Sequence, residues 1–190
     1  MYGGHIGQMV AQIAQGSGAA IVVSDRATLD TVSQGVEFES YVPLGDTVLV
    51  LAWRKGLSFT TPEELASDAV KTVAHPDPKG AIYGRAADAY LTSTGLGARL
   101  GDKLQVVSSV PQVFAYVVNG EIDAGFVNRV MVLNSPDSIG GSLEIAQGYP
   151  PISMVAAVVK DQGSSPQVQA FCEFLKSDRA KEILKKNGLW

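Results

Sequence analysis

The sequence predicts an α/β fold, and three observations support this. Short apolar runs typical of strands alternate with amphipathic helical patterns along the chain. Several helical patterns begin with a serine or threonine followed by proline and end near glycine. The 190 residues are 46% hydrophobic and 18% charged, enough to bury a core in one domain or two small lobes. Because strand–helix alternation favours parallel pairing, we expect mostly parallel sheets with helices on both faces.

The chain is expected to open with an amphipathic helix. Four apolar residues recur at the spacing i, i+3, i+4, i+7, namely Ile6, Met9, Val10 and Ile13. This pattern stops at the Gly-Ser-Gly run of residues 16–18, and residues 19–23 follow as an apolar strand. Glycines at positions 3, 4 and 7 are typical of a loop that arrives from an earlier strand, so we expect a strand upstream of this helix.

The remaining elements follow from the same signals. Apolar runs predict strands at residues 47–53, 71–74, 104–107, 123–127 and 152–159. Caps and helical periodicity predict helices that start near 62 and 166 and others that span 81–94, 108–119 and 178–186.

The run from Ser108 to Asn128 is the most informative of these segments. Ser108 and Ser109 are N-cap residues, and a proline follows within the first turn. In a strand–helix–strand unit, the helix begins at the sheet edge where the next strand ends. The amide of Val110 should therefore face the side chain of Asn128. Ligands of open α/β sheets bind at this edge, and a helix N-terminus there favours an anion.

A second helix N-terminus is expected at the same edge, near Gly80 and Ala81. The strand at 71–74 leads into it just as the strand at 104–107 leads into the Ser109 helix. Backbone amides of both helices can therefore converge on one ligand. His75 precedes a proline here and has no second metal ligand at a useful spacing, so we interpret it as structural.

Composition excludes several classes of function. The net charge is −4 and the pI about 5.1, and lysines gather only at positions 181, 185 and 186, so nucleic acid is not an expected partner. The single cysteine, Cys172, excludes an internal disulfide and a multi-thiolate zinc site. Nucleophile-elbow, phosphate-loop and dinucleotide motifs are absent, so we expect neither an enzyme nor a cofactor. No apolar run reaches bilayer-spanning length, and the first residues lack the features of a signal peptide.

From Lys71 onward, the order of motifs resembles that of the periplasmic molybdate-binding proteins, the solute receptors of molybdate ABC importers. Three segments carry the resemblance, and they read AHPDPKGAIYGRAADAYL, NGEIDAGFV and QAFCEFLKSDRAKEILKKNGLW. The resemblance implies a type II periplasmic binding fold, with two α/β lobes, a ligand cleft between them and a two-strand hinge. It implies one lobe at residues 1–46 with 150–190 and the other at 47–149.

The resemblance also implies a ligand and a set of donors. The family holds a tetrahedral dianion such as molybdate or tungstate through neutral donors, without a cofactor or a metal. By position, the donors of the second lobe are the amides at Gly80 or Ala81 and at Val110, with Ser109 beside them. Asn128 stands where many relatives carry a tyrosine, and its side-chain amide can still donate a hydrogen bond.

The chain also departs from the family pattern. Relatives begin with a strand and a serine-bearing loop, and this sequence begins after that element. The family's second loop usually reads Gly-Ser-Ser-Gly, and here residues 4–7 read Gly-His-Ile-Gly, which removes both hydroxyls. His5 is a candidate anion donor in this loop, and the alternative is an exposed loop histidine. A family aspartate in the following strand is replaced by Ala20.

Two functions are therefore expected from different classes. The first is a periplasmic solute-binding protein that closes on a small oxyanion and presents it to an ABC transporter permease. The second is an anion- or effector-sensing domain that keeps the fold without a transport role. An upstream signal sequence would separate the two.

Overall fold

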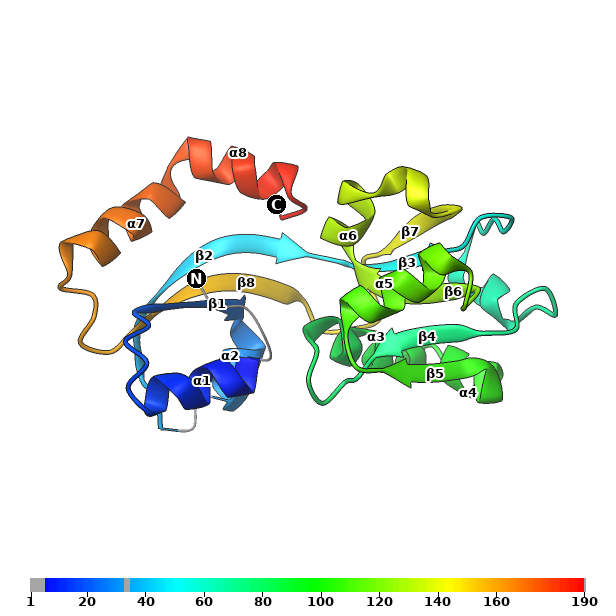
Figure 1. Ribbon diagram of the computed structural model, residues 1–190, viewed down its shortest axis with the longest axis horizontal. Helices are drawn as coiled ribbons and strands as arrows, with labels where there is room; N and C mark the ends of the chain where they lie inside the picture. The colour runs from blue at the N-terminus through cyan, green and yellow to red at the C-terminus, as the bar shows by residue number, and fades with distance from the viewer. Residues whose placement is uncertain (1–5, 33–34, 190) are drawn as a thin grey trace. The chain divides into compact units, whose positions relative to one another are not determined.

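The computed structural model describes residues 6–32 and 35–189, and the chain divides into two compact units (Figure 1). Unit 1 consists of Met1–Thr47 and Ile152–Trp190, and unit 2 is Val48–Pro151. Each unit contains one sheet with helices packed against it, so the α/β class is confirmed. In the described part of the chain, no helix combines the length and apolar character needed to cross a membrane.

Unit 1 is built on a three-stranded sheet with the order β1-β8-β2, in which both strand pairs are antiparallel. Its strands are β1 (Ile21–Asp25), β2 (Phe38–Thr47) and β8 (Ile152–Val159). Its helices are α1 (Ile6–Ala14), α2 (Arg26–Val32), α7 (Pro166–Lys176) and α8 (Asp178–Lys186). Figure 1 shows α1 and α2 on one side of these strands and α7 and α8 on the other. Each face therefore has its own apolar core.

Unit 2 is built on a five-stranded mixed sheet with the order β5-β4-β6-β3-β7. Its strands are β3 (Leu49–Trp53), β4 (Val73–Pro76), β5 (Leu104–Val107), β6 (Ala124–Asn128) and β7 (Gly141–Ile145). Its α-helices are α3 (Ile82–Ser93), α4 (Leu96–Leu100), α5 (Val110–Asn119) and α6 (Arg129–Asn134). Three short 3₁₀ helices complete it, namely η1 (Pro62–Ala66), η2 (Gly101–Lys103) and η3 (Pro136–Ser138).

The expectation of mostly parallel sheets is wrong. Only β4 runs parallel to its two neighbours, β5 and β6, and the other described strand pairs are antiparallel. In unit 1 the late strand β8 inserts between β1 and β2, and local alternation of strands and helices carries no signal for such an insertion. The predicted strand at 47–53 is also divided, because β2 ends at Thr47 and β3 begins at Leu49.

The sequence patterns did not predict β2, and its own residues explain why. Pro43 and Gly45 interrupt its apolar alternation, and the register with β8 shifts between these two positions. Proline and glycine within a strand mark such irregularities rather than a regular ladder. Four shorter elements, α2, α4, α6 and β7, also went unpredicted.

At the amino edge of the unit 2 sheet, one buried carboxylate gathers three donors. Asp123 accepts hydrogen bonds from the Lys71 N–H at 2.6 Å, from the Thr72 N–H at 3.1 Å and from Arg54 Nε at 2.7 Å. Burial is the largest single effect and would raise the pKa of this carboxyl, but the hydrogen bonds and the guanidinium together lower it. Asp123 thus stays ionised and joins the start of β4, the end of β3 and the start of β6.

Candidate functional site

Three strands of unit 2 end together at the carboxyl edge of the sheet. Pro76 at the end of β4 lies in register with Val107 at the end of β5, and the Asp77 N–H donates to the Val107 carbonyl at 2.7 Å. β6 runs parallel to β4 on the other side and ends at Asn128. The turns that lead into α3, α5 and α6 therefore lie side by side, as the predicted strand–helix–strand geometry requires.

Helix α3 begins at this edge without a side-chain cap. Its N-cap residue is Ala81, which has no hydrogen-bonding side chain. The first turn of the helix is held close to the end of β4 by Gly84, where a Cβ atom would lie 2.5 Å from the Pro76 carbonyl oxygen and 2.6 Å from that of Asp77. This close approach fixes a helix N-terminus, with its outward-facing N–H groups, at the strand end.

The turn before α3 changes which amides are available there. The Asp77 carbonyl accepts the N–H of Gly80 at 3.2 Å and the N–H of Ala81 at 2.9 Å. Both predicted amide donors are therefore engaged within the turn. Ile82, the first residue of the helix, is the next amide along the chain, and no intrahelical acceptor exists for an N–H at that position. Sequence reasoning missed Ile82 because turn geometry is not visible in the residue types.

Helix α5 begins at the same edge with a cap. The Ser109 hydroxyl oxygen accepts the Gln112 N–H at 3.4 Å, which leaves the hydroxyl proton available for donation. Pro111 has no N–H, so Val110 carries the amide that opens the helix. Ser108 is used differently, because its hydroxyl donates to the Gln112 side-chain oxygen at 2.7 Å. Of the two serines, Ser108 thus donates its hydroxyl proton within the turn, whereas the Ser109 hydroxyl serves the cap as an acceptor.

Asn128 is the last residue of β6 and the N-cap of α6, and the oxygen and nitrogen of its side chain are used differently. Its Oδ1 accepts the Met131 N–H at 2.9 Å and so caps α6. Its Nδ2 carries two donors that this cap does not use. The side chain of Phe126, two residues earlier on the same face of the strand, lies against Tyr90 of α3 with ring centroids 6.2 Å apart. Asn128 therefore lies on the side of the sheet that α3 covers.

The titratable and charged side chains near this edge are neutral, paired with an opposite charge, or exposed. His75 is buried, its Nδ1 lies 2.9 Å from the Pro76 carbonyl oxygen, and burial lowers its pKa, so the ring is neutral at pH 7. The Arg129 Nε lies 2.8 Å from a Glu144 oxygen, and Lys79 is exposed. Within the described residues, no group of three or more His, Cys, Asp or Glu side chains is placed to hold a metal ion. The predicted donors are therefore neutral amides and a hydroxyl.

Tyr149 is a further residue of this edge that sequence reasoning missed. Its hydroxyl accepts the Leu49 N–H at 2.8 Å and donates to the Ile145 carbonyl, so it inserts between the paired residues of β3 and β7. Burial raises the pKa of this phenol, which keeps it protonated and able to donate. Leu49 is also the register partner of Asn128, so Tyr149 fixes the strand beside that residue.

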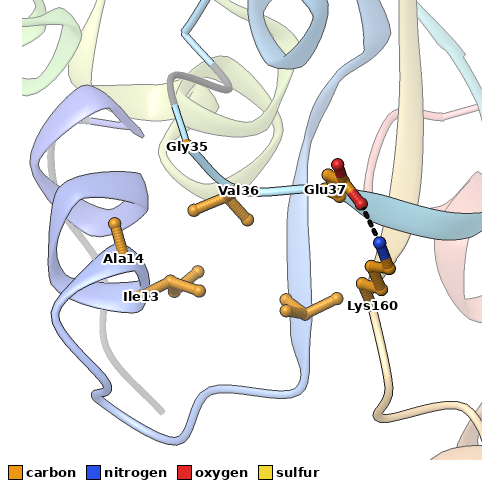
Figure 2. A pocket seen from close by; sticks show the side chains of 7 residues that line it. Ile13, Ala14, Gly35, Val36, Glu37 and Lys160 are labelled. Carbon is orange, nitrogen blue, oxygen red and sulfur yellow. Dashed lines mark hydrogen bonds and ion pairs between the residues drawn. The ribbon is translucent and has the colours of Figure 1, made fainter.

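The other predicted residue, His5, lies outside the described residues. Elsewhere in unit 1, a hollow of about 630 Å³ lies among Ile13, Val36 and Lys160 and their neighbours (Figure 2). Figure 2 shows Lys160 turned toward Glu37, with which it forms an ion pair. Among the described residues that line this hollow, none is a predicted donor, and Lys160 is the cation, already paired with Glu37.

Comparison with known proteins identifies the fold and the family of this chain. Residues 1–189 match the family described as bacterial extracellular solute-binding protein. The molybdate-binding protein ModA of Azotobacter vinelandii is 32% identical over 126 residues, which cover 65% of this chain and 50% of that protein. A putative ABC transporter substrate-binding lipoprotein of Bacillus subtilis, YvgL, is 29% identical over 97% of this chain and 72% of its own length.

The solved structure of the Azotobacter vinelandii periplasmic molybdate-binding protein superposes with a TM-score of 0.83 and 26% identity, covering 98% of this chain and 84% of that one. The matched region spans about half the length of the molybdate-binding relatives found by sequence. The fold expected from the resemblance, a periplasmic binding protein fold of two α/β lobes, is confirmed by this likeness. The family consists of solute-binding proteins rather than enzymes, and this chain belongs to the bacterial extracellular solute-binding proteins.

Proposed function

We propose that this chain binds a small tetrahedral oxyanion, of the molybdate or tungstate type, at the carboxyl edge of the unit 2 sheet. One observation carries the proposal. Two helices, α3 and α5, follow the ends of the neighbouring strands β4 and β5 at this edge, and α3 begins without any side-chain cap. An anion there accepts hydrogen bonds that the protein does not satisfy itself, and it also interacts favourably with both helix dipoles.

The donor set we propose consists of the amides of Ile82 and Val110, the Ser109 hydroxyl and the Asn128 Nδ2. The Gly80 and Ala81 amides join it if the anion displaces the Asp77 carbonyl as their acceptor. Neutral, preorganised donors suit a dianion that must be both bound and released, because no buried counter-charge has to be desolvated. A hydrogen bond to a charged ligand contributes about 1.5–3 kcal/mol, or roughly a tenfold to hundredfold change in affinity.

The proposed biological role follows the relatives. Two of them are named molybdate-binding proteins and a third an ABC transporter substrate-binding lipoprotein. We propose that this chain likewise presents its solute to an ABC transporter permease, in an extracytoplasmic location.

Calorimetric titration with molybdate, tungstate, sulfate, phosphate and a small carboxylate tests the proposal. We expect one of the tetrahedral anions to bind. The decisive variant is Asn128→Asp, which keeps the oxygen that caps α6, removes both Nδ2 donors and adds a negative charge. Affinity should fall by about a hundredfold or more, because a lost donor and a like charge act together.

Ser177→Asp is the matched control for this variant. Ser177 caps α8 in unit 1 by accepting the Ala180 N–H, so the substitution adds the same charge at the same kind of position, away from the proposed site. It should leave the affinity unchanged. The proposal is wrong if no anion binds the parent chain, or if both variants bind as the parent does.

A further inference from the structure

Gln112, in the first turn of α5, uses both ends of its side-chain amide. Its Oε1 accepts the Ser108 N–H at 3.1 Å and the Ser108 hydroxyl at 2.7 Å. Its Nε2 donates to the Tyr116 hydroxyl at 2.7 Å, one turn further along the helix. A backbone N–H can only donate, so the contact with Ser108 identifies which end of the amide is the oxygen. Gln112 is therefore held in one orientation between the turn that precedes α5 and the next turn of the helix.

A similar arrangement occurs at η1, where the acceptor is a carboxylate. Glu64 Oε1 accepts the Thr60 N–H at 2.8 Å, the Thr60 hydroxyl at 2.7 Å and the Thr61 N–H at 2.9 Å. The hydrogen bonds from Thr60 and Thr61 lower the pKa of the Glu64 carboxyl, so it is ionised at neutral pH. Residues 60–64 read Thr-Thr-Pro-Glu-Glu and residues 108–112 read Ser-Ser-Val-Pro-Gln. Both segments therefore place Glu or Gln at the third helical position after two hydroxyl residues, and the two acceptors differ in charge.

The two segments belong to opposite edges of the unit 2 sheet. η1 lies in the connection from the end of β3 to the start of β4, and both of these strand ends are at the amino edge. Helix α5 begins after β5 ends, at the carboxyl edge. The helix dipole favours a carboxylate at the third helical position, and a glutamine provides the same acceptor without this gain. The uncharged acceptor thus lies at the edge where we propose that an anion binds.

We propose that Gln112 is a specificity-determining residue, which sets the charge of the ligand that the N-terminus of α5 accepts. This inference rests on the proposed function, because it concerns the same site. As a neutral amide, Gln112 satisfies the Ser108 donors without cancelling the partial positive charge at the helix N-terminus. The Val110 amide then remains in a field that favours an arriving anion. A carboxylate at position 112 would itself be the anion of this turn, as Glu64 is at η1.

Reciprocal substitutions test the proposal in the full chain. Gln112→Glu keeps an acceptor for Ser108 and adds one negative charge, and the Tyr116 hydroxyl can donate to its second oxygen. Glu64→Gln is the matched control, because it exchanges the same two groups at η1. Gln112→Ala removes the side chain without adding a charge. Affinities for molybdate and for sulfate are measured by calorimetry at low and at high sodium chloride, and the thermal midpoint of each variant is measured without anion.

Gln112→Glu should weaken anion binding by at least about tenfold at low salt, and the loss should shrink at high salt, which screens the added charge. Its thermal midpoint should not fall, because a carboxylate caps α5 at least as well. Glu64→Gln and Gln112→Ala should bind within about threefold of the parent.

Two results would overturn the proposal and leave the proposed anion site standing. One is a Gln112→Glu variant that binds as the parent does, and the other is a Gln112→Ala variant that loses as much affinity as Gln112→Glu. A parent chain that binds neither molybdate nor sulfate would instead contradict the proposed function, and this proposal would fall with it.

Discussion

The two edges of the unit 2 sheet differ in the acceptors that they provide for backbone amides. At the amino edge, the Lys71 and Thr72 amides point to the Asp123 carboxylate, which is buried and also paired with Arg54. At the carboxyl edge, the N-cap residue of α3 is Ala81, whose side chain offers the first helical amides no acceptor, and the Ser109 side chain caps α5 by accepting the Gln112 N–H. The amino edge carries its own anion, whereas no charged side chain caps α3 or α5 at the carboxyl edge.

This difference separates a structural use of charge from a functional one. A carboxylate built into the chain satisfies its donors permanently and ties three strands together. Donors without a built-in acceptor are weakly satisfied by water and gain most from an anion that arrives and leaves. We therefore propose that the amino edge serves stability and the carboxyl edge serves binding.

The largest effect is expected for Asp123→Ala. The substitution leaves the Lys71 and Thr72 amides and Arg54 without their acceptor, and it should lower the free energy of unfolding by about 3 kcal/mol. Urea denaturation followed by circular dichroism measures this. Asp137→Ala, an exposed carboxylate on η3, is the control and should change stability by less than about 0.5 kcal/mol. If the two variants are equally stable, Asp123 does not have this structural role.

Gly84→Ala should affect both stability and binding. The new methyl group would meet the Pro76 and Asp77 carbonyl oxygens, so α3 must move away from β4 at a cost of about 2 kcal/mol. The displaced N-terminus should also weaken anion binding, measured by calorimetry on the folded protein. Gly97→Ala on α4 is the control, because its nearest neighbour is the Leu91 side chain at 3.3 Å and it should leave binding unchanged. If Gly84→Ala binds the anion with unchanged affinity, the N-terminus of α3 is not part of the binding site.

The two edges should lose stability in different pH ranges. The folded-state pKa of His75 is lowered by burial, so its contribution is complete above the unfolded pKa of about 6.5 and is lost as the pH falls toward the folded value. The folded-state pKa of Asp123 is also lowered, so its contribution persists until the pH falls below about 3.9. Urea unfolding from pH 8 to 3 should show both losses. His75→Gln should remove only the first and Asp123→Asn only the second, and any other pattern would contradict these causes.

Ser109→Ala is expected to have the smallest effect on folding. The loss of the α5 cap should cost about 1 kcal/mol. Ser109→Asp restores an acceptor for the Gln112 amide, so it should recover that stability while weakening anion binding through its charge. If Ser109→Asp binds the anion as well as the parent does, Ser109 is a cap alone.

Local signals were sufficient for the segment that frames the site. The serine cap, the proline and Asn119-Gly120 predicted a helix at 108–119, and α5 is observed at Val110–Asn119, with Gly120 in the left-handed conformation. The apolar run at 123–127 predicted a strand, and β6 is observed at Ala124–Asn128, parallel to β4 as the inference of the edge required. These features are encoded by residues adjacent in sequence, so a pattern along the chain captures them.

Features set by distant parts of the chain were not predictable in this way. Insertion of β8 between β1 and β2 joins residues more than a hundred positions apart, and it makes the unit 1 sheet antiparallel. The engagement of the Gly80 and Ala81 amides depends on how the chain turns at Asp77, and Tyr149 reaches Leu49 across the sheet. Family resemblance could supply the fold, but it could not supply these contacts.

Amide chemical shifts test the central claim most directly. In ¹⁵N-labelled protein titrated with molybdate, the Ile82 and Val110 amides should shift with the occupancy of the site, and the Lys71 and Thr72 amides at the opposite edge should not. Binding that leaves Ile82 and Val110 unchanged, or that shifts all four amides alike, would contradict the assignment of the anion to the carboxyl edge of unit 2.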